Sequence, residues 1–215
     1  IAQEQCRALM AAGSTVRPAG WQKRRGWATG AEPFRYVLPT TTFSERMTIH
    51  DAGMEPVELL WLGRAHTGGD TIVHLPRSRV AFIGDVGFFG MTPLMGDGYC
   101  SDWIAVCDRV LAMDVDTLVP GHGPVGGKAE LRTMREYLVF LRSEARLRFD
   151  RGLPPGRAAA DIDLGRFRAW PDADRVVDNV VRLYAEFGGT PAPSRDIAAT
   201  AEAHREYAAA TAASR

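Results

Sequence analysis

The stretch AHTGGD at residues 65–70 connects two segments that have the residue pattern of β-strands, and it has more bearing on the fold than any other. Two later stretches share its design: FIGDVGF at residues 82–88 and VPGHGP at residues 119–124. In each of the three, apolar residues lead into a glycine and a His or Asp side chain. A strand end holds a side chain rigidly, and glycine lets the backbone turn sharply beside a bound ion. The three stretches therefore have the form of ligand-bearing strand ends.

The periodicity around these stretches predicts an α/β protein. Strands are expected over residues 43–50, 57–63, 71–75, 79–83 and 116–120, the first four forming a β-meander with short turns. Helices are expected over residues 102–113, with Ser101 and Asp102 as N-cap candidates, and over residues 128–149 and 174–187. A short helix is expected to end near Gly13, and residues 14–40 have an irregular pattern.

The length of 215 residues predicts one domain. We expect this domain to occupy residues 1–187, with a core at residues 43–149 and a C-terminal helical extension at residues 150–187. Residues 188–215 are a Gly/Pro linker followed by an Ala-rich tail. Because the tail has little apolar surface to bury, we expect it to fray.

The charge balance gives no indication of a nucleic-acid or membrane partner. Lys and Arg number 26, as do Asp and Glu, and the basic cluster at residues 23–25 is typical of a solvated loop. No apolar run approaches the roughly 20 residues that cross a bilayer. We therefore expect a soluble, cytoplasmic protein that acts on a small molecule. Its three cysteines follow no metal or disulfide spacing, and the sequence does not predict an oligomeric state.

His66, Asp85 and His122 are the candidate metal ligands, one in each stretch. Imidazole nitrogen and carboxylate oxygen bind zinc and non-haem iron well, and a carboxylate can bridge two cations. Taken singly, His66 could be a loop histidine, Asp85 a turn residue and His122 a core histidine. Sequential strands tend to be neighbours, so the three could meet at one edge of a sheet. Their shared context favours a metal site.

The three stretches resemble, in order and in strand context, the third, fourth and fifth metal-binding motifs of the metallo-β-lactamase superfamily. The resemblance covers roughly residues 43–149 and implies an αβ/βα sandwich with a dinuclear site at one edge of two packed sheets. It implies that His66 is a ligand of the first metal, that Asp85 bridges both metals, and that His122 is a ligand of the second. It implies zinc, two ions in an intact homologue, with iron or manganese also compatible.

The family's HxHxDH cluster has no counterpart in this sequence. We therefore expect a sandwich that is incomplete at the N-terminus, a chain that binds zinc weakly, and little turnover. His50 and His74 fall in predicted strands and are not expected to be ligands. Asp70 could either orient His66 without touching the metal or close the turn that follows it. Both alternatives stay open.

The resemblance implies a hydrolase in which a metal-bound hydroxide attacks an ester, thioester, lactone or amide. A lactam is a poor candidate, because Phe88 stands where lactamases with a thiolate at the fourth motif keep a lysine. The apolar segment from Phe88 to Tyr99 either lines a pocket for a hydrophobic group or packs in the core, and core packing is favoured. Two alternatives to the hydrolase remain: a mononuclear iron dioxygenase acting on a persulfide, and a truncated scaffold without catalysis.

Overall fold

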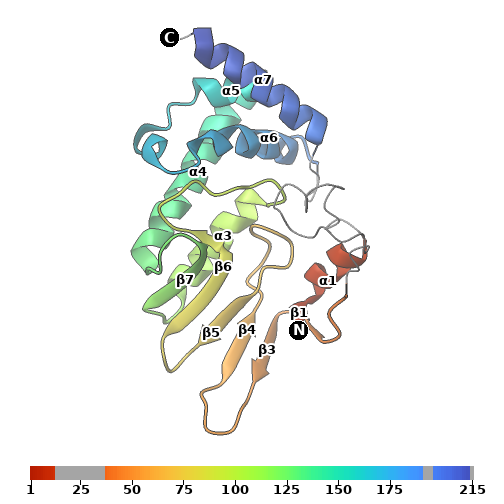
Figure 1. Cartoon of the computed structure of the whole chain (residues 1–215), viewed down its shortest axis with the longest axis vertical. Helices are drawn as coiled ribbons and strands as arrows, with labels where there is room; N and C mark the ends of the chain where they lie inside the picture. The colour runs from red at the N-terminus through yellow and green to blue at the C-terminus, as the bar shows by residue number, and fades with distance from the viewer. Residues whose placement is uncertain (13–36, 191–195, 214–215) are drawn as a thin grey trace, which may run out of the picture.

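The computed structural model describes residues 1–12, 37–190 and 196–213. Its main sheet has five strands in the order β3 (Arg46–Ile49), β4 (Val57–Leu60), β5 (Ile72–Leu75), β6 (Val80–Phe88) and β7 (Thr117–His122). Strands β3 to β6 are antiparallel neighbours, and β7 pairs with β6 in parallel (Figure 1). The expected meander is confirmed.

The segment expected as one strand over residues 43–50 belongs to two sheets. Its start, β2 (Thr42–Phe43), pairs in parallel with β1 (Ala2–Gln3), and its remainder is β3. The short N-terminal helix is confirmed as α1 (Glu4–Ala11), which begins directly after β1. The basic cluster at residues 23–25, and most of the stretch expected to be irregular, lie outside the described residues.

The helices α3 (Cys100–Ala112) and α4 (Lys128–Asp150) contact each other and strand β6. Beyond the end of α4 lie α5 (Pro155–Asp161), α6 (Val176–Phe187) and α7 (Ile197–Ala213), stacked above the sheet in Figure 1. Short 3-10 turns at Gly165–Ala169 and Ala173–Arg175 lead into α6. The three long helices expected from the sequence are therefore confirmed, with starts shifted by up to two residues.

The core lies between the sheet and these helices. Along β6, Ala81 and Ile83 are fully buried, whereas the intervening Phe82 is 44% exposed, as strand alternation requires. The expected stripe of α4, which contacts α3, α5, α6 and β6, is buried: Leu131, Met134, Leu138, Leu141 and Ala145. Within the described residues, no helix combines the length and the apolarity that crossing a bilayer requires.

The start of α3 is capped by a residue from far along the chain. The expected N-cap candidates Ser101 and Asp102 lie inside the helix, and Tyr99 at the N-cap position makes no side-chain capping bond. Instead, the carboxylate of Glu186 on α6 accepts the backbone N–H groups of Cys100 at 2.9 Å and Ser101 at 3.3 Å. An anion at a helix N-terminus satisfies open donors and complements the helix dipole, so this contact joins α6 to α3.

The C-terminal tail is a packed helix, so the expectation that it frays is wrong. Helix α7 packs on α5 and α6, and its Ala203 is 1% exposed. Gly156 on α5 lies against the backbone carbonyl of Ala203, and its N–H donates to Glu206 at 3.0 Å. Small residues on both helices allow close backbone approach, which lets a helix with few large apolar side chains dock.

Candidate metal centre

A tight turn stabilised by Asp70 carries His66. The Asp70 carboxylate accepts the N–H of Thr67 at 2.8 Å and its hydroxyl at 2.7 Å, and Ala65 N–H donates to the carbonyl of Thr67 at 2.9 Å. Burial raises the pKa of Asp70, against the lowering effect of these hydrogen bonds. These contacts are those of a turn. An effect of Asp70 on the orientation of His66 stays a prediction.

Asp85 lies inside strand β6, whereas the sequence predicted it beyond a strand end. Strand β6 continues to Phe88, and its register with β7 is irregular on both sides of Gly84. Gly84 has a φ of +51°, a conformation that glycine adopts without strain. This irregularity interrupts the regular pleat next to Asp85, so a rigid strand can hold the carboxylate without a strand end.

His122 is the last residue of β7 and lies beside Phe88 in the sheet register. Its ring stacks on the Phe88 ring with centroids 4.4 Å apart and planes 17° apart. Its carbonyl accepts the N–H of Phe89 at 2.9 Å. The His66 ring also packs near Phe88, at 5.7 Å, and edge-on to Trp103 at 5.6 Å. Phe88 therefore packs against both imidazoles, and Trp103 packs against that of His66.

The structure brings His66, Asp85 and His122 together. His66 Nδ1 lies 3.6 Å from Asp85 Oδ2, and His122 Nε2 lies 3.5 Å from Asp85 Oδ1. Each carboxylate oxygen thus faces a different imidazole. The three side chains are 21%, 40% and 46% exposed in that order, so they are accessible to solvent and to ions.

Among the described residues, no three His, Cys, Asp or Glu side chains converge on a single ion. This agrees with the pairing just described, in which each imidazole shares only one oxygen of Asp85. The described residues could therefore offer two protein ligands to each of two ions, with Asp85 common to both. Whether His66, Asp85 and His122 bind metal stays a prediction.

The other candidate ligands lie elsewhere. His74 pairs with Glu58 at 2.9 Å, and His204 on α7 pairs with Asp178 at 3.0 Å. Cys100 and Cys107 are buried free thiols, and burial raises the pKa of Cys107 to about 12. A thiol that keeps its proton at neutral pH is a poor metal ligand.

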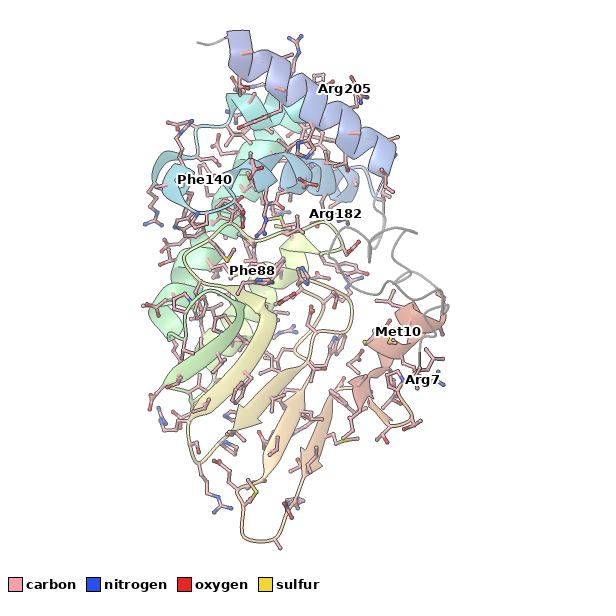
Figure 2. The ribbon with its side chains drawn as sticks, viewed as in Figure 1. Arg7, Met10, Phe88, Phe140, Arg182 and Arg205 are labelled. Carbon is pink, nitrogen blue, oxygen red and sulfur yellow. The ribbon has the colours of Figure 1, made fainter. Side chains whose placement is uncertain are left out.

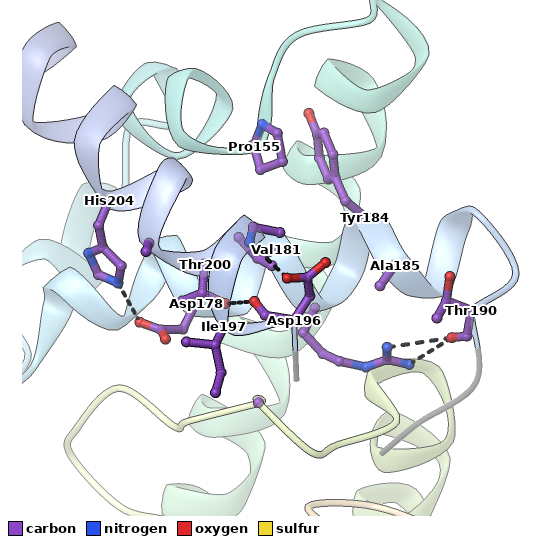
Figure 3. A pocket seen from close by; sticks show the side chains of 14 residues that line it. Pro155, Asp178, Val181, Tyr184, Ala185, Thr190, Asp196, Ile197, Thr200 and His204 are labelled. Carbon is purple, nitrogen blue, oxygen red and sulfur yellow. Dashed lines mark hydrogen bonds and ion pairs between the residues drawn. The ribbon is translucent and has the colours of Figure 1, made fainter. Parts of the chain in front are cut away.

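The segment after Asp85 packs in the core, as the favoured alternative predicted. Phe88, Phe89 and Met95 are each 2% exposed or less. A cavity of about 730 Å³ lies instead between α6 and the start of α7, with the hydrogen-bonded side chains of His204 and Asp178 in its wall (Figure 3). His66, Asp85 and His122 are not among the residues that line this cavity.

Sequence reasoning missed two features around the site. Gly121 lies so close to Asp85 that a Cβ there would collide with the carboxylate. Helix α6 also carries three polar side chains that hydrogen-bond to the backbone of the segment after Asp85. They belong to Asn179, Arg182 and Glu186. The signal was present, since these three positions are spaced by three and four residues on the apolar face of an amphipathic helix.

Two curated proteins are similar to this chain. The alpha subunit of 2,4-dinitroanisole O-demethylase from Nocardioides sp. (strain JS1661) is 36% identical over 88 residues, which are 40% of this chain and 26% of that protein. A linear primary-alkylsulfatase from Pseudomonas sp. (strain ATCC 19151) is 25% identical over 140 residues, which are 60% of this chain and 26% of that protein. The chain therefore spans about a quarter of the length of these relatives.

Among solved structures, the inverting sec-alkylsulfatase Pisa1 from Pseudomonas sp. has a similar fold, with a TM-score of 0.55 at 18% identity. The likeness covers 70% of this chain and 27% of that one. A family model described as the metallo-beta-lactamase superfamily matches residues 15–122, half of the chain, and this match includes His66, Asp85 and His122. With its mixed α/β fold and this match, the chain belongs to the metallo-beta-lactamase superfamily.

Proposed function

We propose that this chain is the metal-binding part of a zinc-dependent hydrolase whose substrate is an ester, with sulfate esters as the first class to test. His66 and His122 are the proposed ligands of two separate ions, and Asp85 is the proposed bridge. The observation that carries the proposal is that Asp85 presents one carboxylate oxygen to each imidazole, at 3.6 Å and 3.5 Å.

These distances fit zinc better than they fit direct hydrogen bonds. A strong N–H···O bond has a donor–acceptor distance of about 2.7–3.2 Å. Two ligands of one tetrahedral zinc ion, each about 2.0–2.1 Å from the metal, lie about 3.3 Å from each other. The separations of 3.6 Å and 3.5 Å are therefore close to those of ligand pairs that share an ion. Nitrogen and oxygen donors are also the ligand types that zinc takes in catalytic sites.

Each residue contributes to this site through its own chemistry. Asp85 places a carboxylate between two imidazoles, and each carboxylate oxygen can act as a ligand beside an imidazole nitrogen. Phe88 and Trp103 pack against the imidazole rings and exclude water from that side, which restricts ring motion. The chemistry that bound zinc supplies is acidification of a water molecule and polarisation of the substrate oxygen.

One of the two curated relatives supports the substrate class, whereas the other is named as a subunit of 2,4-dinitroanisole O-demethylase. One is named as a linear primary-alkylsulfatase, and a solved structure of similar fold is a sec-alkylsulfatase. Of the substrates that the fold serves, an ester agrees best with these names. Fold alone does not choose a substrate, so the relatives' names give the order in which candidates are tested.

The test of metal binding is a zinc titration monitored by competition with a chromophoric chelator. Asp85→Ala is expected to abolish both binding events, because one carboxylate serves both ions. His66→Ala and His122→Ala are each expected to abolish one event and keep the other. His74→Ala is the matched control, since His74 pairs with Glu58 away from the site. Wild-type zinc binding by the Asp85→Ala variant would refute the proposed ligand set.

The reaction is tested with the zinc-loaded chain on 4-nitrophenyl sulfate and 4-nitrophenyl acetate. We expect slow hydrolysis, because two protein ligands from the described residues leave each ion incompletely held. The rate should exceed that of Asp85→Ala. Equal rates for wild type and Asp85→Ala would favour a scaffold without catalysis. Purification of the chain with one bound iron ion would favour the dioxygenase.

A further inference from the structure

One face of the α6 region binds the backbone of the segment that follows Asp85. The residues involved are spaced by four, three and four positions, which places them on one side of a helix. Each of them makes a hydrogen bond with a main-chain atom within residues 92–101. Arg175 Nη1 donates to Thr92 O at 2.8 Å, Asn179 Nδ2 to Pro93 O at 2.8 Å and Arg182 Nε to Gly98 O at 2.8 Å, and Glu186 accepts from Cys100 N at 2.9 Å.

The opposite side of this segment contacts the turn that carries His66. Tyr99 N–H donates to the carbonyl of Ala65 at 2.9 Å. A Cβ on Gly98 would lie 3.1 Å from Ala65 O and 3.5 Å from His66 O, so the backbone of Gly98 lies next to that of Ala65 and His66. The segment at residues 98–99 is therefore held between α6 and the His66 turn.

We propose that Arg182 is a positioning residue for His66, acting through Gly98 and Tyr99. Arg182 fixes the carbonyl of Gly98, and the N–H of the same planar peptide, that of Tyr99, donates to the carbonyl of Ala65. This fixes the backbone directly before His66 and thus the direction of its imidazole. The metal part of this inference rests on the proposed function, whereas the positioning of the His66 turn does not.

The side chain of Arg182 suits this role because it is buried and held on two sides. It is 4% exposed. Its Nε bonds Gly98 O, while Nη1 and Nη2 point to Thr190 O at 3.5 Å and 3.4 Å, the dashed pair in Figure 3. A planar guanidinium held on both sides has one orientation available. In Figure 2, Arg182 lies on α6 above Phe88, the residue that supports the imidazoles.

The neighbouring contact of Arg175 provides a matched control. Arg175 also donates one hydrogen bond to a carbonyl of the same segment, but at Thr92, six residues before Gly98. If α6 merely stabilises the segment, loss of either arginine has a similar effect at His66. If Arg182 positions His66, only the substitution of Arg182 weakens the hydrogen bond between Tyr99 N–H and Ala65 O.

The experiment measures amide hydrogen exchange by NMR in the apo chain, for wild type and for Arg182→Met, Arg182→Lys and Arg175→Met. The probes are the amides of Tyr99 and Ala65, which donate to Ala65 O and Thr67 O, and the reference is the amide of Trp61, which donates to Glu45 O just beyond the end of the β3–β4 pair. Arg182→Met should raise exchange at both probes about tenfold or more, with the reference unchanged. Arg182→Lys keeps one charged donor and should lie between wild type and Arg182→Met.

Zinc affinity is measured on the same four proteins. Arg182→Met should weaken zinc binding about tenfold, which is typical for residues that hold a ligand in place, and Arg175→Met should leave it unchanged. Wild-type exchange at Tyr99 and Ala65 in Arg182→Met would overturn the inference, as would equal effects of the two Met variants. If the wild type binds no zinc, the proposed function fails, and the exchange rates alone still decide the positioning role.

Discussion

Gly121 on β7 leaves no room for a side chain because the Asp85 carboxylate fills the space beside it. A Cβ built on Gly121 would collide with Asp85 Oδ1 and lie 2.8 Å from the backbone nitrogen of Asp85. The closeness of β6 and β7 at this point brings the carboxylate next to the imidazole of His122, one residue further along. Glycine at position 121 is thus part of the geometry of the candidate metal centre.

Gly121→Ala should therefore impair metal binding. The added methyl group must displace either Asp85 or the end of β7, and overpacking of this kind costs about 1–3 kcal/mol. We expect zinc affinity to fall about tenfold or more, as it does when the support of a ligand is lost. Urea unfolding and chelator competition measure the two effects.

Gly188→Ala is the control for this substitution, since the nearest atom to its added methyl group lies at 3.4 Å, an ordinary contact. It should change zinc affinity little. Unchanged zinc affinity in Gly121→Ala would show that the Asp85 carboxylate is not required where the structure places it.

Phe88→Ala should be among the more damaging core substitutions near the site. Phe88 is 2% exposed and packs against His122, His66 and Trp103. Truncation of a buried phenylalanine costs about 3–5 kcal/mol, because it leaves a cavity. Phe82→Ala in the same strand is the control, since Phe82 is 44% exposed. Thermal unfolding that shows similar losses for both variants would contradict this packing.

The sequence predicted most of the fold because its periodicities are strong. Strands β3 to β7 and helix α4 appear where apolar alternation or a 3.6-residue stripe predicts them. Prediction from the sequence failed where a contact with a residue far along the chain determines the local structure. Glu186 lies 85 residues from the α3 residue Ser101 whose N–H it accepts, and no pattern near Ser101 indicates that partner. Likewise, α7 docks because Gly156 faces Ala203, which its own weak amphipathicity does not predict.

The candidate site was likewise predicted in part from the sequence. His66, Asp85 and His122 could be selected from sequence because each follows apolar strand residues and adjoins or closely precedes glycine. Their mutual distances depend on the register of β6 with β7, which is irregular near Gly84 and cannot be derived from alternation. The support of the site by α6 depends on tertiary contacts alone, so the sequence shows only the spacing of Asn179, Arg182 and Glu186.

The Glu58–His74 pair should make the free energy of unfolding depend on pH in the acid range. The hydrogen bond from His74 Nδ1, at 2.9 Å, is the main cause that lowers the pKa of Glu58 below its ordinary value of 4.5, with Arg46 adding to it. A lowered folded-state pKa contributes stability that is present above the ordinary value and is lost as the pH falls through the lowered one.

Wild type should therefore exceed Glu58→Gln in urea midpoint at neutral pH, and this advantage should shrink as the pH falls below 4.5. Glu45→Gln, at an exposed position in the turn before β3, serves as the control. A difference between wild type and Glu58→Gln that does not vary with pH would show that the hydrogen bond between Glu58 and His74 is not formed in solution.

Gly156→Ala should release α7 from α5. The added methyl group would collide with the carbonyl of Ala203, and the hydrogen bond from Gly156 N to Glu206 would stretch as the helices separate. Because α7 buries little apolar surface, a loss of about 1–3 kcal/mol from overpacking is large compared with what holds it. Limited proteolysis followed by intact-mass analysis should show faster cleavage within residues 188–215. Arg157→Ala, at the exposed next position of α5, should be cleaved at the wild-type rate. If Gly156→Ala is also cleaved at that rate, the close approach of the two helices does not hold the tail.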